Sequence, residues 1–204
     1  MSGTSPRRAP RERQRDPERT KARILAAAKA EFGSKGYAAA RVSEIARGAG
    51  VNKQLISYYF GGKEGLYAEV TSEQFSGLAA MTVTDRPMAD VVADFARDGL
   101  RDPDQARLFL RENMAEEAGG ETGTPPERAF LHSQLDYLRA RQEAGDFPAD
   151  VDPQALLLML IAAASAPVAF RRVGSVLTGQ DPASAEFVEY YAEQLSRMVR
   201  HLKD

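Results

Sequence analysis

Polar side chains of the kinds that bind nucleic acid are crowded into residues 51–67, VNKQLISYYFGGKEGLY. Lysine, glutamine, serine and tyrosine can hydrogen-bond to phosphates or to base edges in the major groove, and leucine can contact a thymine methyl group. A short helix over 52–59 would present such residues outward, at Lys53, Gln54, Leu55, Ser57 and Tyr58. For Tyr58, a phosphate contact and a packing role are both open from the sequence.

Lys63 follows the glycine pair at 61–62, which ends that short helix. The next helix begins at this lysine, and a helix N-terminus offers free N–H groups to an anion. Lys63 would add a formal positive charge to those groups, so we predict that it contacts a backbone phosphate. Phe60, between the two helices, is expected to pack inside the domain instead.

The elements that would hold these side chains in place span residues 42–59 and have the pattern of a helix-turn-helix. Two short helices that cross steeply need a small residue at their contact, here Ala46, and a turn residue that tolerates positive φ, here Gly50. The apolar positions that would face one another are Ile45, Val51, Ile56 and Tyr59. Because a recognition helix enters the groove by its N-terminal part, a short helix suffices.

Charge is distributed unevenly along the 204 residues, although the net charge is only −2. Residues 1–63 hold 14 Lys and Arg against 5 Asp and Glu, whereas the remainder holds 13 against 24. A basic front and an acidic back indicate that the front meets a polyanion. We predict a disordered basic arm over 1–15, a helix-turn-helix domain over 16–63 and a larger helical domain over 64–204. The arm could lie along phosphates or simply be a solvated tail.

The whole chain beyond the arm is predicted to be helical, which makes the fold all-α with about nine helices. Asp-Pro pairs, which start helices by capping and by the fixed φ of proline, begin at positions 16, 102, 152 and 181. No segment of convincing length alternates with the period of two that is typical of a strand. Gly33 and Gly36 are expected to end the first helix. The predicted helices cover 17–34, 42–48, 52–59, a segment from Lys63, 88–100, 103–118, 125–144, 153–173 and 183–202.

Two segments, RILAAAKAEFGSKGY and VSEIARGAGVNKQLISYYFGGKEGLY, lie within residues 17–70. In type and spacing they resemble the DNA-binding domain of the TetR family (tetracycline-repressor-like) of transcriptional regulators. The resemblance implies a homodimer that binds a palindromic operator in double-stranded DNA. It also implies that the domain over 64–204 binds a small-molecule effector and carries the dimer contacts. Carried onto this chain, it places Lys53, Gln54, Leu55 and Tyr58 at the groove and Lys63 on the phosphate backbone.

A few positions depart from the family's usual pattern. The family often has Thr or Ser at the positions of Ala40 and Arg41, where a hydroxyl would cap the second helix and touch phosphate. Here Arg41 is predicted to contact phosphate by its charge and Ser43 to supply a hydroxyl. Ser57 stands where the family often has Tyr, which removes one phosphate contact. Asn52 replaces a Ser or Thr as the cap of the recognition helix and is a further candidate for DNA contact.

The second half contains an uncharged run of 16 residues, 155–170, which is shorter than the roughly 20 residues of a membrane-spanning helix. We expect a helix covered on more than one side and kinked at Pro167. The last helix carries an apolar stripe of Phe187, Tyr191, Leu195, Met198 and Leu202. Together with the resemblance, these features predict a four-helix dimer interface from the helices near 153–173 and 183–202 of two copies. An intrachain core is the alternative.

The effector pocket is the part that the sequence determines least. The residues that could line it, and could equally be ordinary core, are Phe95, Phe109, Met114, His132, Tyr137, Met159 and Phe170. The polar residues that could orient a ligand on otherwise apolar helices are Asn113, His132 and Gln134. The chain has no cysteine, and its two histidines are far apart in the sequence, so we expect neither a zinc site nor another cofactor.

These features predict a sequence-specific, DNA-binding transcriptional regulator, and more narrowly a repressor that a small-molecule effector releases from its operator. No signal peptide is apparent and cysteine is absent, so we expect a cytoplasmic protein. An enzyme is disfavoured because the sequence has no nucleotide-binding glycine loop, metal-ligand cluster or Ser-His-acid arrangement. A DNA binder without sequence preference is the other alternative, although it would not need a large acidic domain.

Overall fold

The computed structural model describes residues 17–82, 86–114 and 123–203. The predicted arm over 1–15 and the predicted helix end at residue 118 lie outside these ranges. Within them the chain forms ten α-helices, one short 3₁₀-helix and no strand, which confirms the predicted all-α class. The α-helices are α1 (Pro17–Ala39), α2 (Val42–Ala49), α3 (Lys53–Phe60), α4 (Lys63–Ala80), α5 (Met88–Arg101), α6 (Pro103–Met114), α7 (Pro125–Glu143), α8 (Pro153–Ala169), α9 (Arg171–Thr178) and α10 (Ala185–Arg200), and the 3₁₀-helix is His201–Lys203.

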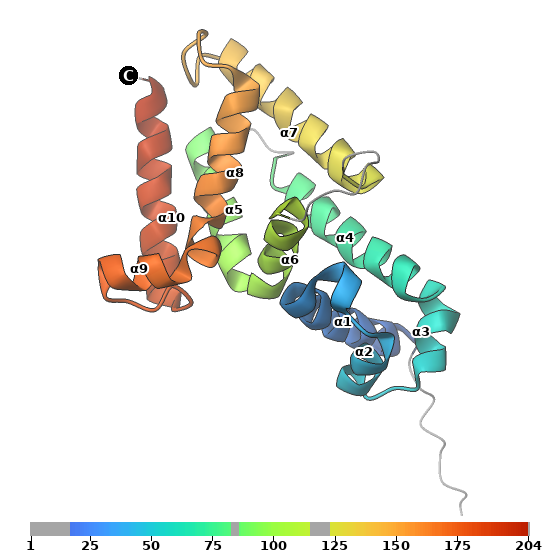
Figure 1. Cartoon of the computed structure of the whole chain (residues 1–204). Coiled ribbons are helices and arrows are strands. Elements are labelled where there is room, and N and C mark those ends of the chain that lie inside the picture. The colour runs from blue at the N-terminus through green and yellow to red at the C-terminus, as the bar shows by residue number, and fades with distance from the viewer. Residues whose placement is uncertain (1–16, 83–85, 115–122, 204) are drawn as a thin grey trace, which may run out of the picture.

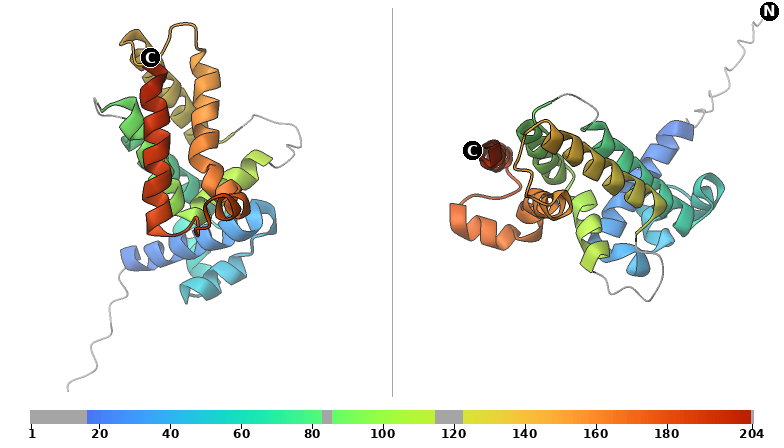
Figure 2. Two further views of the ribbon diagram at one scale, coloured as in Figure 1. Left: turned by 90° about the vertical axis from the view of Figure 1, so that its left-hand side faces the viewer. Right: turned by 90° about the horizontal axis from the view of Figure 1, so that it is seen from above.

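The helices form two groups joined by α4 and α6 (Figure 1). Helices α1, α2 and α3 lie together at one end of the molecule. Helix α6 packs against α1 on one side and against α5 and α8 on the other, while α4 extends from α3 to α7. Helices α8 and α10 stand side by side at the other end, with α9 across their lower ends (Figure 2).

Each group has its own buried apolar cluster. The cluster under the first group comes from α1–α4 and α6 and includes Ile24, Phe32, Ile45, Ile56, Leu66, Val70 and Leu108. The second comes mainly from α5, α7, α8 and α10 and includes Met88, Ala96, Leu138, Leu156, Leu160, Ala192, Leu195 and Val199. Full burial of a Val, Leu, Ile, Phe or Met side chain stabilises a fold by about 1.5–3 kcal/mol, so these clusters hold the helices in their relative positions.

Helix α1 is interrupted at one of the two glycines that were expected to end it. At Gly36 φ is 74° and ψ is 168°, so two helical segments meet at a kink there, and the second segment runs to Ala39. Gly33 is buried inside the helix, and a Cβ at this position would lie 2.3 Å from the carbonyl oxygen of Asp104 in α6. The break at Gly36 confirms the predicted end of the first helical segment near residue 34, whereas Gly33 lies inside the helix and permits close packing of α1 on α6.

The region after residue 169 also differs from the prediction. Instead of one helix over 153–173 kinked at Pro167, α8 ends at Ala169 and α9 follows at an angle of 78°. The bend lies at Phe170, whose φ and ψ of −116° and 38° are not helical. Helix α9 occupies part of a segment that was expected to be a loop, and it accounts for the tenth helix.

The last helix begins at Ala185 rather than at the Asp-Pro pair starting at residue 181. Ser184 is its N-cap and accepts a hydrogen bond from the backbone N–H of Phe187 at 3.2 Å. Asp181 instead forms an ion pair with Arg171 of α9 at 2.9 Å. This Asp-Pro pair therefore belongs to the α9–α10 connection.

The described residues leave part of the surface of α8 uncovered. Leu156 and Leu160 are buried, whereas the exposed fractions of Leu158 and Met159 are 69% and 57%. No single helix in the described ranges has both the length and the apolar composition needed to cross a membrane. Helices α8 and α9 meet that test only as a pair, and the pair is bent by 78°.

Candidate nucleic-acid interface and internal cavity

The turn between α2 and α3 has the geometry that the helix-turn-helix pattern predicted. Gly50 adopts the left-handed conformation, with φ of 61° and ψ of 41°, and its N–H donates to the carbonyl of Arg47 at 3.1 Å. The N–H of Val51 donates to the carbonyl of Ala46 at 3.0 Å. The side chain of Asn52 caps α3 by accepting a hydrogen bond from the N–H of Gln54 at 2.9 Å.

Buried apolar contacts fix the orientation of α3 against α1 and α2. Ile45, Ala46 and Ile56 are at most 4% exposed. Val51 and Tyr59 are half-buried and pack against the same cluster. All five lie where the helix-turn-helix pattern predicted them.

The opposite face of α3 is open to solvent. Lys53, Gln54, Ser57 and Tyr58 are exposed, and no side-chain hydrogen bond or ion pair within the described residues involves them. The Tyr58 ring touches only the edge of its neighbour Tyr59, at 5.0 Å between centroids. Leu55 is half-buried against the apolar cluster, so it is partly a packing residue. Helix α3 therefore presents hydrogen-bonding side chains on a rigid support.

The start of α2 is held by an acid of α1. The backbone N–H of Arg41, the N-cap residue, donates to the carboxylate of Glu31 at 3.2 Å, and Lys35 pairs with the same carboxylate at 2.8 Å. Partial burial would raise the pKa of Glu31, but these two hydrogen bonds outweigh it and hold the pKa below its ordinary value. The side chains of Arg41 and Ser43 are exposed beside α3.

Lys63 stands at the first position of α4, as predicted, but its side chain also has partners within the chain. Its ammonium donates to the carbonyl of Ala38 at 3.2 Å and lies 4.6 Å from the centroid of the Tyr37 ring. The Lys63 charge is thus held near the end of α1, beside the N-terminus of α4.

Two residues that hold α3 in position were not identified from the sequence. A Cβ at Gly65 would lie 1.8 Å from the carbonyl oxygen of Phe60, so only glycine lets α4 begin this close to the end of α3. The guanidinium of Arg23 in α1 bonds to the carbonyls of Ala49 and Gly50, the latter at 3.2 Å, and ties α1 to the turn. A glycine within the first turn of a helix was the available signal for Gly65, whereas the sequence offers no signal for Arg23.

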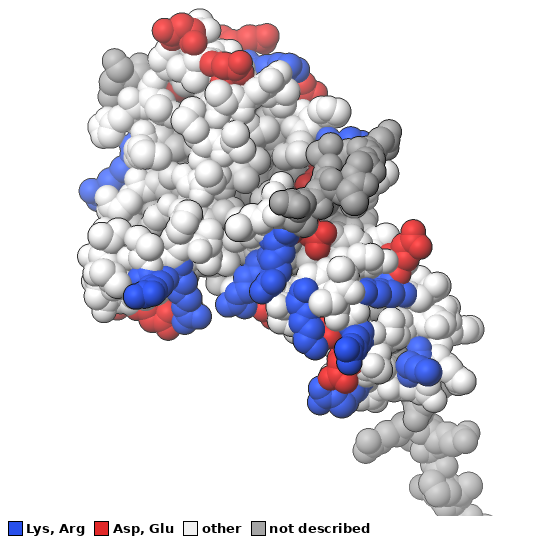
Figure 3. Space-filling view, viewed as in Figure 1, with Lys and Arg blue, Asp and Glu red and all other residues white. Residues whose placement is uncertain are grey.

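Basic side chains gather around this unit. Figure 3 shows Lys and Arg over the end of the molecule formed by α1–α3, and Asp and Glu at the opposite end near the α7–α8 connection. On this face the end that carries α3 is basic, and the end at the α7–α8 connection is acidic.

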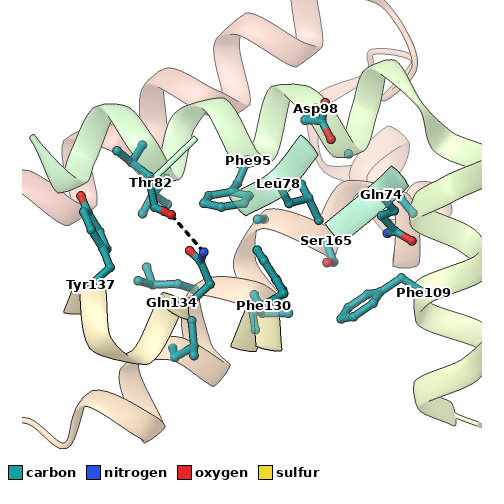
Figure 4. A pocket seen from close by; sticks show the side chains of 18 of the residues that line it. Gln74, Leu78, Thr82, Phe95, Asp98, Phe109, Phe130, Gln134, Tyr137 and Ser165 are labelled. Atoms are coloured by element: carbon teal, nitrogen blue, oxygen red, sulfur yellow. Dashed lines mark hydrogen bonds between the residues drawn. The ribbon is translucent and has the colours of Figure 1, made fainter. Parts of the chain in front are cut away.

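A cavity of about 130 Å³ lies between α4, α5, α6, α7 and α8 (Figure 4). Of the residues predicted to line a pocket, Phe95, Phe109 and Tyr137 line this cavity. Its other walls include Phe130 and Leu160, and its polar residues include Gln74, Thr82, Asp98, Asp102, Gln105, Gln134 and Ser165. The cavity is thus mainly apolar, with a few polar groups.

A second, more open hollow of about 510 Å³ lies between α6, α7 and α8. The predicted pocket residues Met114, His132 and Phe170 line it, and Phe109 stands between the two spaces because it lines both. Met159 lines neither and points to solvent from α8. In the described part of the chain, no group of three or more His, Cys, Asp or Glu is arranged to hold a metal ion.

Comparison with known proteins decides the family. The family model described as bacterial regulatory proteins, tetR family, matches residues 24–70, and a tetracyclin repressor-like C-terminal domain model matches residues 85–199. The chain belongs to the TetR family. It is a DNA-binding transcriptional regulator, and α2–α3 are the helix-turn-helix of this TetR-family chain.

Relatives of this TetR-family chain match over most of their length. The HTH-type transcriptional repressor SCO4008 of Streptomyces coelicolor is 32% identical over 91% of this chain and 97% of its own. The HTH-type transcriptional regulator RutR of Escherichia coli is 26% identical over 86% of each chain. The crystal structure of SCO4942 from Streptomyces coelicolor superposes with a TM-score of 0.71, 27% identity and coverage of 89% of this chain and 97% of the other. SCO4008 and RutR are named as regulators of transcription.

Proposed function

We propose that this TetR-family regulator is a repressor that binds a palindromic operator as a homodimer and leaves it when a small molecule occupies the cavity. The observation that carries the proposal is the outer face of α3, where Lys53, Gln54, Ser57 and Tyr58 are exposed on a helix fixed by buried contacts. Such side chains can read base edges and hold phosphates. The relative SCO4008 is named as a repressor, which supports the direction of regulation.

The proposed DNA contacts divide into two kinds. Lys53, Gln54 and Leu55 would face bases in the major groove, because they lie at the N-terminal part of the recognition helix. Residues that would hold the sugar-phosphate backbone are Arg41, Ser43, Asn52, Tyr58 and Lys63. Ser57 lies on the same outward face of α3 but lacks the phosphate contact of a tyrosine. Backbone contacts position the protein, while base contacts carry the sequence preference.

The proposed dimer would use the open side of α8, α9 and α10. Large apolar side chains are exposed there, at Met159, Val173, Val176, Leu177, Tyr190 and Met198. Helix α9 contributes no buried residue within the chain, so its apolar side chains have no cover of their own. Exposed apolar groups gathered on one side favour a protein partner, and a second copy presents the same surface.

The cavity would couple ligand binding to DNA binding because helix α6 both lines the cavity and packs against the DNA-binding domain. Helix α6 supplies Gln105 to the cavity and, at Asp104, packs on Gly33 of α1. A ligand can shift the dimer away from its DNA-binding form only to the extent that it binds the other form more tightly. The proposal places this regulator in the cytoplasm with its DNA and assigns it no catalytic turnover.

Binding of randomised DNA by variants tests the proposed roles of α3. Gln54→Ala should relax base preference at one position of each half-site, by about 1–3 kcal/mol if Gln54 makes a bidentate contact. Tyr58→Phe and Lys63→Ala should weaken binding to all sequences by a similar factor, because they remove phosphate contacts. Arg139→Ala removes an exposed arginine of α7 and is the control, expected to bind as the wild type does. Unchanged affinity and unchanged base preference in all three test variants would refute the placement of the recognition helix.

A further inference from the structure

Several polar groups that line the cavity donate hydrogen bonds to the protein itself. The side-chain amide nitrogen of Gln134 donates to the hydroxyl oxygen of Thr82 at 3.1 Å, and that hydroxyl donates to the carbonyl of Ala79 at 3.0 Å. The side-chain amide nitrogen of Gln105 donates to the carbonyl of Val70 at 3.3 Å. The groups still available to a ligand at these positions are therefore mainly acceptors.

The charged groups of the lining have one sign. Asp98 and Asp102 line the cavity, whereas no Lys, Arg or His among the described residues does. Asp102 already accepts a hydrogen bond from the backbone N–H of Gln105 at 3.2 Å. The half-buried carboxylate of Asp98 has no hydrogen bond or ion pair with any described residue. Lys29 and Arg101 attract it only from beyond ion-pair distance.

The cavity has an acidic end and a neutral end. Figure 4 shows Asp98 at the end that also holds Gln74, Ser165 and Phe109, while Tyr137 lies at the other end. The rings of Phe95 and Phe130 lie between the two ends. The volume of about 130 Å³ is close to the roughly 150 Å³ of an apolar cavity that holds benzene. An occupant of about one ring is therefore the size that fits.

We infer that the cavity binds a small apolar amine, with its protonated nitrogen toward Asp98 and its ring or chain against Phe95 and Phe130. The protonated nitrogen would donate a charge-assisted hydrogen bond to the Asp98 carboxylate, which is partly shielded from water. The faces of the two aromatic rings would also attract the positive charge. A carboxylate ligand of the same shape would be repelled by Asp98. The inference names the class of effector and so rests on the proposed function.

Calorimetry with three probes of one shape tests this charge preference in the full chain without DNA. Phenethylamine, 2-phenylethanol and 3-phenylpropanoate carry a positive, neutral and negative group on the same ring. We expect phenethylamine to bind at least about tenfold more tightly than 2-phenylethanol, as is typical of a hydrogen bond to a charged group, and 3-phenylpropanoate to bind least. Asp98→Asn should abolish the difference between the amine and the alcohol. Asp90→Asn removes an acid of α5 that does not line the cavity and should preserve it.

Equal affinity of the amine and the alcohol for the wild type would overturn the inference. If Asp98→Asn still bound the amine more tightly than the alcohol, the role of Asp98 would be overturned. The same would follow if Asp90→Asn lost this preference as fully as Asp98→Asn. Failure of all three probes to bind would also overturn the inference, since the ring is required to fit. Because the measurement contains no DNA, these results do not depend on whether the chain represses transcription.

Discussion

Gly33 and Gly77 both lie inside helices, yet their surroundings differ. A Cβ on Gly33 would meet the backbone of Asp104 at 2.3 Å, whereas a Cβ on Gly77 would meet no atom within 4 Å. Neither residue has positive φ, so the difference between them is one of space and not of backbone conformation. Close approach of α1 to α6 thus depends on a single missing methyl group.

Gly33→Ala should therefore destabilise the protein by about 1–3 kcal/mol, because α1 or α6 must shift to admit the methyl group. Gly77→Ala is the matched control and should stabilise the protein by up to about 1 kcal/mol, since alanine favours the helix. Urea denaturation of both variants measures the free energy of unfolding. Equal stability of the two variants would contradict the close contact at Gly33.

Asp98→Asn should change how stability depends on pH. Burial raises the pKa of Asp98, and the Asp102 carboxylate raises it further, while Arg101 and Lys29 oppose the shift. The folded state then binds a proton more tightly than the unfolded state, so the wild type loses stability as the pH rises from the ordinary value of 3.8 through the raised pKa.

We expect Asp98→Asn to be more stable than the wild type at pH 7 and to lose that advantage as the pH falls toward 4. Thermal unfolding at several pH values measures the difference. A variant that is less stable than the wild type at pH 7 would show that the Asp98 carboxylate is satisfied in the folded chain.

At the scale of the element, helix starts and the helix-turn-helix were predictable, whereas the last third of the chain was less so. Residues 42–59 were predictable because a cap, a positive-φ glycine and an apolar pattern all agree there. The break at Phe170 was not, because Pro167 is tolerated inside α8 and the bend comes three residues later. Asp181 was misleading because its carboxylate pairs with Arg171 across a loop rather than starting a helix.

The outer face of α3 was more predictable from the sequence than the cavity, because α3 is positioned by local contacts and the cavity by distant ones. The outward side chains of α3 follow from its period, since the turn fixes which face is buried. The cavity depends on where five helices from distant parts of the sequence meet, so the sequence suggested Phe95 and Tyr137 but not Asp98. Met159, on the exposed side of α8, was named as a pocket residue because an all-apolar run does not reveal which of its faces is inward.

A substitution at Gly65 of α4, which is not a proposed DNA contact, should displace helix α3. Gly65→Ala places a methyl group against the carbonyl of Phe60, so the end of α3 must move. We expect operator affinity to fall by at least about tenfold, because base contacts require close positioning. Fluorescence anisotropy with labelled operator DNA, at a temperature where circular dichroism shows the variant folded, measures this. Gly77→Ala, farther along α4, should bind as the wild type does, and equal binding by both variants would contradict the role of Gly65.

At the scale of the whole molecule, the basic end and the apolar side of α8–α10 have different partners. Met198→Glu should weaken the proposed dimer, because it places a charge on the exposed apolar side of α10. Met114→Glu changes a more exposed methionine at the end of α6, which lines the hollow between α6, α7 and α8, and should leave the dimer intact. Sedimentation velocity over a range of concentrations measures both. A monomeric wild type, or dimers of equal strength in both variants, would contradict this interface.

Sequence-specific operator binding by the α3 pair is tested most directly by selecting bound fragments from random DNA with the purified wild-type protein near physiological salt. We expect an enriched palindrome whose half-site centres lie about one helical turn apart or slightly more, because two recognition helices of a dimer enter successive major grooves. Enrichment of no sequence, with binding that depends only on salt, would contradict sequence-specific recognition by α3.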